Sequence, residues 1–129
     1  PASDALFAVN GNAYVKKLFV TLTGWPDYVF HKEYKLPGLP EVERYIAMHQ
    51  HLPGVTPADE VVKKGLDLGA SQSELLKKIE ELTLYLIEQN KKIKLQEDKI
   101  DQLVSVNEKL EKQQAEIDAL KELVKKLAR

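Results

Sequence analysis

The sequence predicts an α+β protein with a short N-terminal β-ribbon, a small helical head and a long C-terminal parallel coiled coil. All six glycines and all six prolines lie before Ser71, so no residue after it has to interrupt a helix. Apolar residues after Ser71 recur at spacings of three, four and seven, which is the pattern of a coiled coil. Near the other end, Asn10-Gly11 lies between runs rich in Val, Tyr, Phe and Leu, a combination that favours a hairpin.

Composition excludes several classes of function. The chain has 129 residues, a net charge of -1 from 19 basic and 20 acidic residues, and no cysteine. This balance provides no field that would attract nucleic acid or anionic lipid, and without cysteine there is neither a disulfide nor a catalytic thiol. No apolar run approaches the roughly 18 residues of a membrane span. We therefore predict no nucleic-acid partner, no membrane span and no cofactor.

We expect three parts along the chain: the ribbon over residues 1–22, the head over residues 23–70 and the coil over residues 71–129. In the ribbon, Lys16-Lys17 interrupts the alternation of polar and apolar residues. A two-stranded ribbon alone is marginally stable in water, so neighbouring strands would have to come from other copies of the chain.

The head carries an aromatic cluster and two short helices. Trp25, Tyr28 and Phe30 are predicted to lie in the core or at a subunit interface, because large aromatic side chains dominate burial in small domains. A first helix is predicted over residues 39–50, with Pro40 in its first turn. A second is predicted to start with Thr56 as cap and Pro57 at the first position, and to end at Gly65.

The coil is predicted to begin at a capping box, Ser71-Gln-Ser-Glu74, and to follow two registers. In the first register, Ile79, Leu86, Ile93 and Ile100 occupy a positions, and Leu75, Leu82, Gln89, Gln96 and Leu103 occupy d positions. In the second register, Leu103, Leu110, Ile117 and Val124 occupy a positions, and Val106, Gln113, Leu120 and Leu127 occupy d positions. The seam thus shifts by three residues near 100–107, a stammer that overwinds the supercoil locally.

Another interpretation of this shift is that the helix breaks. Ser105-Val-Asn-Glu108 has the capping-box pattern, so the chain could turn there and fold back. We favour a continuous helix because neither Gly nor Pro marks a turn.

Periodicity does not decide how many chains assemble. Ile at a with Leu at d favours dimers, whereas Gln89 and Gln96 at successive d positions reduce stability and fix the alignment of the chains. Dimer and trimer both remain open at this point. On the outer face we expect ion pairs four residues apart: Glu74 with Lys78, Glu88 with Lys92, Glu108 with Lys112, and Glu122 with Lys126.

No motif for catalysis or metal binding stands out. His49 and His51 are two residues apart across a helix end, so they are not expected to share a face, and no cysteine or acidic cluster has ligand spacing. There is no glycine-rich phosphate loop, nucleophile elbow or zinc-protease motif. We predict that the protein is not an enzyme and has no metal site.

A set of ordered segments resembles a known family. The segments are Trp25-Pro-Asp-Tyr-Val-Phe, Tyr34-Lys-Leu-Pro, Leu39-Pro-Glu-Val-Glu, His51-Leu-Pro-Gly, Ala58-Asp-Glu-Val and the start of the coil from Leu75. Together they resemble the C-terminal module of bacterial tail-fibre-like and cell-surface fibrous proteins, and more distantly the intramolecular chaperone domains of phage tail spikes.

This resemblance implies a homotrimer, with a dimer as the alternative, outside the cell or on a virion-like particle. The module would assemble and cap an upstream β-structured stalk of the same protein, with Trp25, Tyr28 and Phe30 between head and stalk. Two other hypotheses follow from it. A self-cleaving chaperone would use Ser3 next to Asp4, but the sequence has no lysine before Lys16 to act as base. A receptor-binding fibre tip would hold a glycan on the head aromatics.

Overall fold

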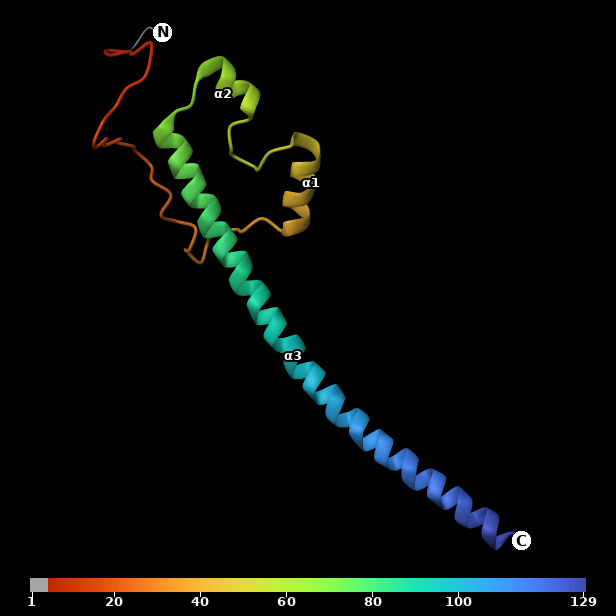
Figure 1. Cartoon of the computed structure of the whole chain (residues 1–129). Helices are drawn as coiled ribbons and strands as arrows, with labels where there is room; N and C mark the ends of the chain where they lie inside the picture. Colours follow the sequence, from red (N-terminus) through yellow and green to blue (C-terminus); the bar gives the residue numbers. More distant parts are fainter. Residues whose placement is uncertain (1–4) are drawn as a thin grey trace. The chain divides into compact units, whose positions relative to one another are not determined.

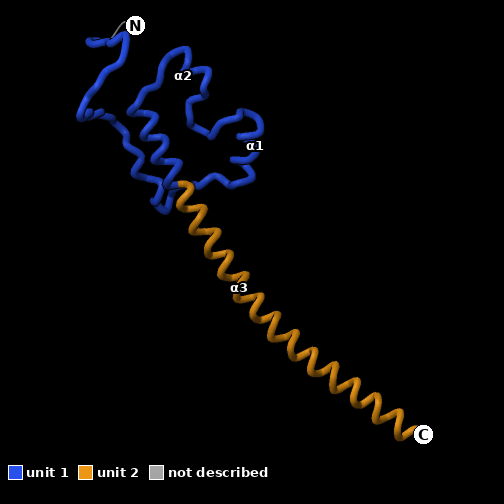
Figure 2. The backbone as a smooth tube through the Cα atoms, viewed as in Figure 1, with its two compact units in different colours: residues 1–80 blue, residues 81–129 orange. Residues whose placement is uncertain are grey.

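The structure is a computed structural model that describes residues 5–129 of the chain. The helices are α1 (Leu39–His49), α2 (Ala58–Lys64) and α3 (Leu68–Leu127), and the described residues contain no β-strand (Figure 1). The chain divides into two compact units, residues 1–80 and residues 81–129 (Figure 2). The helices α1 and α2 belong to the first unit, whereas α3 contributes residues to both.

The predicted β-ribbon is wrong, and with it the α+β fold class. Residues 5–22 have no strand assignment, and no hydrogen bond joins the two sides of Asn10-Gly11 in this described segment. A hairpin without a third strand gains too little to hold its pairing. The segment instead rests side chains on a helix: Val20 and Leu22 lie against the Gly69 position of α3. Asn-Gly was a correct signal for a bend but did not lead to strand pairing.

The two short helices are present where the sequence places them. In α1, Pro40 lies in the first turn with Glu41, and Gln50 ends the helix in the left-handed conformation with its N–H on the Ile46 carbonyl. The helix α2 starts at Ala58, one residue later than predicted. Pro57 itself is the N-cap with extended backbone, and no side chain caps it, so the predicted cap by Thr56 is wrong. Gly65 ends α2, as expected.

The long helix starts earlier than the predicted capping box. Its first residue is Leu68, and the Ala70 N–H donates to Asp67 Oδ1 over 2.9 Å. Asp67 therefore caps the helix, because its carboxylate accepts from an N–H that has no partner inside the first turn. Ser71 lies within the helix. The capping pattern at Ser105 also lies within it, and α3 continues to Leu127.

The buried core of the first unit is small. Val29 is the buried apolar residue, at 1 % exposure, with Pro26 and Gly69 also buried. Gly69 permits a close approach, since a Cβ there would come within 2.8 Å of a Val20 methyl carbon. Gly54 is needed for two reasons: its φ is +82°, and a Cβ would overlap the Glu74 carboxylate.

Candidate self-association interface

The C-terminal part of α3 is exposed along its whole length. Every residue from Leu86 to Arg129 is exposed, and many of them are large and apolar. Exposed apolar surface that continues over many turns is characteristic of a binding surface. The second unit thus presents a surface without a core of its own.

The predicted seam residues all lie on this helix with their side chains exposed. Among the apolar ones, exposure ranges from 45 % at Leu75 and Ile117 to 63 % at Val124. The others fall between these values: Ile79, Leu82, Leu86, Ile93, Ile100, Leu103 and Leu110. Gln89 and Gln96 are exposed as well.

One row of residues runs through both registers, and we call it the shared row. Its members are seven apart: Leu68, Leu75, Leu82, Gln89, Gln96, Leu103, Leu110, Ile117 and Val124. Leu68 was missed by the sequence analysis because Ser71 was taken as the start of the helix. It is 48 % exposed and extends the row by one heptad.

A second row flanks the shared row, and it changes sides near Leu103. Before that point the flank is four residues ahead of the shared row: Ile79, Leu86, Ile93 and Ile100. After it, the flank is three residues ahead: Val106, Gln113, Leu120 and Leu127. A row of seven-residue spacing drifts by about 20° per heptad around a straight helix, so keeping it against a partner requires a left-handed supercoil. At the shift of register, the apolar stripe therefore changes from one side of the shared row to the other, while the shared row itself continues without a break.

The first turns of α3 have a second, covered face. Gly69 is buried, and Ser73, Leu76 and Glu80 are partly buried, whereas Leu75 is exposed. In a helix, residues three, four and seven apart share a side, so the covered residues form one face and Leu75 lies outside it. Leu75 and Ile79 of the seam stay exposed, whereas Leu68, at the start of the shared row, lines a groove together with Val20 and Leu22.

Polar side chains flank the seam and pair along the helix. Lys92 Nζ lies 2.8 Å from Glu88 Oε1, and this hydrogen bond and charge lower the pKa of Glu88. Lys78 pairs with Glu74 at 3.4 Å. At the C-terminal end Glu122 pairs with Lys125 rather than with the predicted Lys126. The Glu88–Lys92 and Glu122–Lys125 pairs are exposed, so they keep the outer face soluble and contribute little to stability. The Glu74–Lys78 pair is largely covered, with side-chain exposures of 25 % and 15 %.

A similar ion pair between residues four apart lies on α2. Lys64 Nζ lies 2.9 Å from Glu60 Oε1, and the hydrogen bond to Glu60 raises the pKa of Lys64. The two acidic residues of the first turn, Asp59 and Glu60, also suit the positive end of the helix dipole.

The predicted aromatic cluster of the head is exposed. Trp25, Tyr28 and Phe30 are between 44 % and 60 % exposed, and the residues buried among them are Pro26 and Val29. The Tyr28 ring lies 5.8 Å from that of Tyr34 between centroids. Trp25 lines a shallow groove in which Leu18, Val20 and Leu22 face Leu68, Gly69 and Gln72. The sequence analysis missed Val29, although its position between two aromatic residues was a usable signal for an inward side chain.

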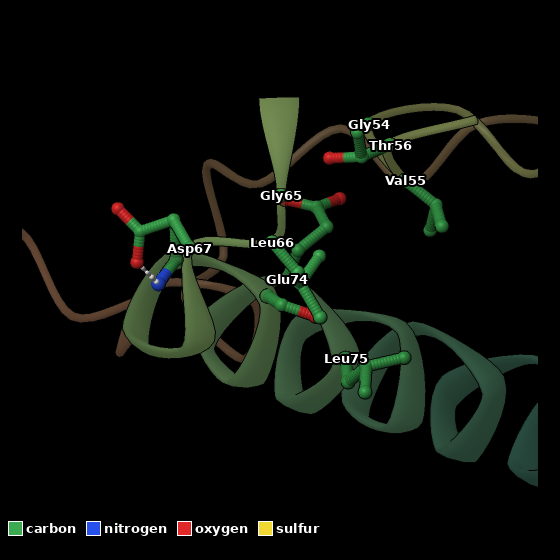
Figure 3. A pocket seen from close by; sticks show the side chains of 10 residues that line it. Gly54, Val55, Thr56, Gly65, Leu66, Asp67, Glu74 and Leu75 are labelled. Carbon is green, nitrogen blue, oxygen red and sulfur yellow. Dashed lines mark hydrogen bonds between the residues drawn. The ribbon is translucent and has the colours of Figure 1, made fainter. Parts of the chain in front are cut away.

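A small cavity lies where the loops of the head meet the start of α3 (Figure 3). It has a volume of about 240 Å³ and is lined by residues 54–56, residues 65–67 and one side of α3 including Glu74. The Glu74 carboxylate packs on Gly54 and pairs with Lys78. Both carboxylates of this cavity already have partners: Glu74 pairs with Lys78 and Asp67 accepts from the Ala70 N–H, so the geometry indicates a joint between loop and helix.

The two neighbouring histidines come closer than their spacing suggested. Gln50 has a φ of 59°, and this left-handed turn brings the His51 ring to within 6.0 Å of the His49 ring, between centroids. Tyr45 lies against both, at 4.2 Å and 5.7 Å. His51 Nδ1 lies 2.9 Å from the Leu52 carbonyl oxygen, which can only accept, so this nitrogen carries the proton. Within residues 5–129, no three His, Cys, Asp or Glu side chains are grouped as metal ligands would be.

Of the hypothetical self-cleavage residues, Ser3 and Asp4 lie outside the described residues. Lys16 is exposed, and the neighbouring Lys17 places its Nζ 4.8 Å from the centre of the Phe19 ring. As for membranes, none of the helices found in residues 5–129 combines the length and the apolar character needed to cross a bilayer.

Comparison with known proteins finds no relative of this chain. No family model, curated protein or solved structure matches the chain. The resemblance to fibre modules described above therefore stays a prediction.

Proposed function

We propose that the chain is a non-enzymatic assembly module that joins copies of itself through the seam of α3. One observation carries this proposal: the seam is apolar apart from Gln89, Gln96 and Gln113, yet every residue from Leu86 onward is exposed. Each Leu or Ile side chain that moves from water into a packed interface contributes about 1.5–3 kcal/mol. A second copy provides the complementary surface, because its seam carries the same repeat.

The polar residues support self-association over a membrane or nucleic-acid role. The helix flanks carry acids and bases in pairs, such as Glu88 with Lys92, rather than a basic face. A reader of DNA or an anchor on anionic lipid would need that basic face. A self-associating coil needs only soluble flanks and an apolar seam.

The proposal includes three copies as the expected number, with two as the alternative. Three follows from the resemblance to fibre modules, whereas the residues at the a and d positions leave both numbers open. The exposed Trp25, Tyr28 and Phe30 would then contact other parts of the assembled fibre. The extracellular or virion setting rests on the same resemblance.

Light scattering during size-exclusion chromatography tests the proposal. One chain has a mass of 14.6 kDa, and we expect a particle of three such masses. Replacing Ile93→Lys together with Ile100→Lys puts two charges into the seam, and we expect this variant to elute as single chains with reduced helix content by circular dichroism.

Ile87→Lys together with Leu95→Lys is the matched control. These two residues are also apolar and exposed, at 47 % and 68 %, but lie outside both rows of the seam. We expect the control to keep the mass of the wild type. A wild-type chain that stays monomeric at micromolar concentration would overturn the proposal, as would an Ile93/Ile100 variant that still assembles.

A further inference from the structure

We propose that the copies associate in parallel and in register, with ion pairs between chains formed by Lys92 with Glu97 and by Glu116 with Lys121. This inference rests on the proposed function and specifies its partner: a second copy of this chain, pointing the same way and aligned residue for residue. It depends on charges beside the seam and on amides within it, which are independent of the apolar pattern.

The charges beside the seam fit a parallel alignment. In parallel coiled coils, the residue at g of one chain faces the residue at e of the next heptad in its neighbour. In register, this places Lys92 opposite Glu97 and Glu116 opposite Lys121 of the other chain. The remaining g residues, among them Lys78, Lys99 and Lys109, face Thr, Val and Gln. No such contact joins like charges.

A slip of one heptad weakens this complementarity, although it brings Lys99 opposite Glu97. It would place Lys109 opposite Lys121 and would leave Glu116 without a basic partner across the seam. Like charges in direct contact are unfavourable and suppress wrong alignments. The slip would also place Gln96 opposite Leu103, so that an amide would lose its partner in an apolar layer.

The amides within the seam exclude the antiparallel arrangement by the same reasoning. Gln89, Gln96 and Gln113 all occupy d positions. In a parallel pair, d faces d, so each amide meets its own copy and can exchange a hydrogen bond. In an antiparallel pair, d faces a, and the a positions from Ile79 to Val124 are all Ile, Leu or Val. Each amide would then be buried against hydrocarbon.

The structure leaves the required groups accessible. Glu97, Glu116 and Lys121 are exposed and form no ion pair within the described chain, and Lys92 contacts only an exposed partner in Glu88. Lys92 can therefore turn between Glu88 of its own chain and Glu97 of a neighbour at little cost, since both carboxylates lie at the surface.

Single cysteines test the orientation, because the natural chain contains none. Leu75→Cys and Val124→Cys place a thiol near either end of the shared row. After mild oxidation, or with a short bismaleimide, we expect each variant alone to give a cross-linked dimer on a non-reducing gel. Ala115→Cys, on the outer face of the second register, is the matched control and should link only at the rate of random collision.

The other outcomes distinguish failure of this inference from failure of the proposed function. If neither end variant links alone but their mixture does, the copies are antiparallel: the inference fails and the proposed function stands. If Leu75→Cys links better to Leu82→Cys than to itself, the register is wrong. If light scattering finds single chains, both this inference and the proposed function fail.

Charge reversal gives a second test that needs no new bond. Glu97→Lys should lower the midpoint of thermal unfolding of the assembly, because Lys92 then faces a lysine. Adding Lys92→Glu should restore part of the midpoint, because it re-forms the pair between chains but removes the pair with Glu88 of the same chain, and high salt should shrink the difference between the variants. A Glu97→Lys variant with an unchanged midpoint, or a double variant that is not restored, would overturn the proposed pairing.

Discussion

The two parts of α3 meet different surroundings, although their sequences look alike. In residues 68–80 the chain covers one face of the helix, with Gly69 buried beneath Val20 and Leu22. From Leu86 onward no face is covered. The comparison teaches that the covered face of α3 and its seam are different faces, so the seam stays exposed in both parts.

The largest expected effect comes from the uncovered part. Leu103 belongs to the shared row at the point where its flank changes sides. Leu103→Ala should lower the stability of the assembly by about 2–5 kcal/mol per chain, because it leaves a cavity in a packed layer. Thermal unfolding followed by circular dichroism at several protein concentrations measures the loss. Leu95→Ala, outside the seam, should change stability by only about 0.5 kcal/mol or less. Equal effects of the two substitutions would mean that the shared row is not an interface.

A smaller effect is expected in the covered part. Gly69→Leu places a side chain where Val20 and Leu22 already lie, and we expect a loss of about 1–3 kcal/mol from overpacking. Fluorescence of Trp25, the single tryptophan, should report an earlier melting of the head, while the mass by light scattering stays that of the wild type. Ala70→Leu, at an exposed neighbouring position, is the control. An unchanged melting curve for Gly69→Leu would show that the extended segment does not rest there.

The smallest effect concerns the start of the helix and distinguishes two caps. Asp67→Ala removes the carboxylate that accepts from the Ala70 N–H and should cost about 0.5–2 kcal/mol. Ser71→Ala should have almost no effect, since Ser71 lies inside the helix. Chemical denaturation followed by circular dichroism compares them. The reverse order of effects would restore the capping box predicted from the sequence.

Local patterns in the sequence were enough for the helices. The absence of Gly and Pro after Ser71 allowed one long helix, Pro40 and Gly65 marked the ends of two short ones, and the heptad spacing predicts the seam residues, which stay a prediction. These features depend on propensity and periodicity over a few turns, which the chain carries by itself. The same local reasoning failed at the capping patterns, because several side chains compete for one helix start. Here the Ala70 N–H donates to Asp67 Oδ1 and the helix begins at Leu68, ahead of Ser71.

Tertiary contacts decided what the sequence could not. A strand requires a partner strand, which the local sequence does not specify. Val20 and Leu22 lie against α3 without strand pairing, because Gly69 lets them approach. Which side chain of an aromatic run turns inward is likewise a matter of the packed surroundings, and here it is Val29. The sequence alone thus determined the long helix and its apolar rows, whose periodicity is a property of the chain. Only the fold determined which face of that helix the head covers, because coverage depends on which distant segments reach it.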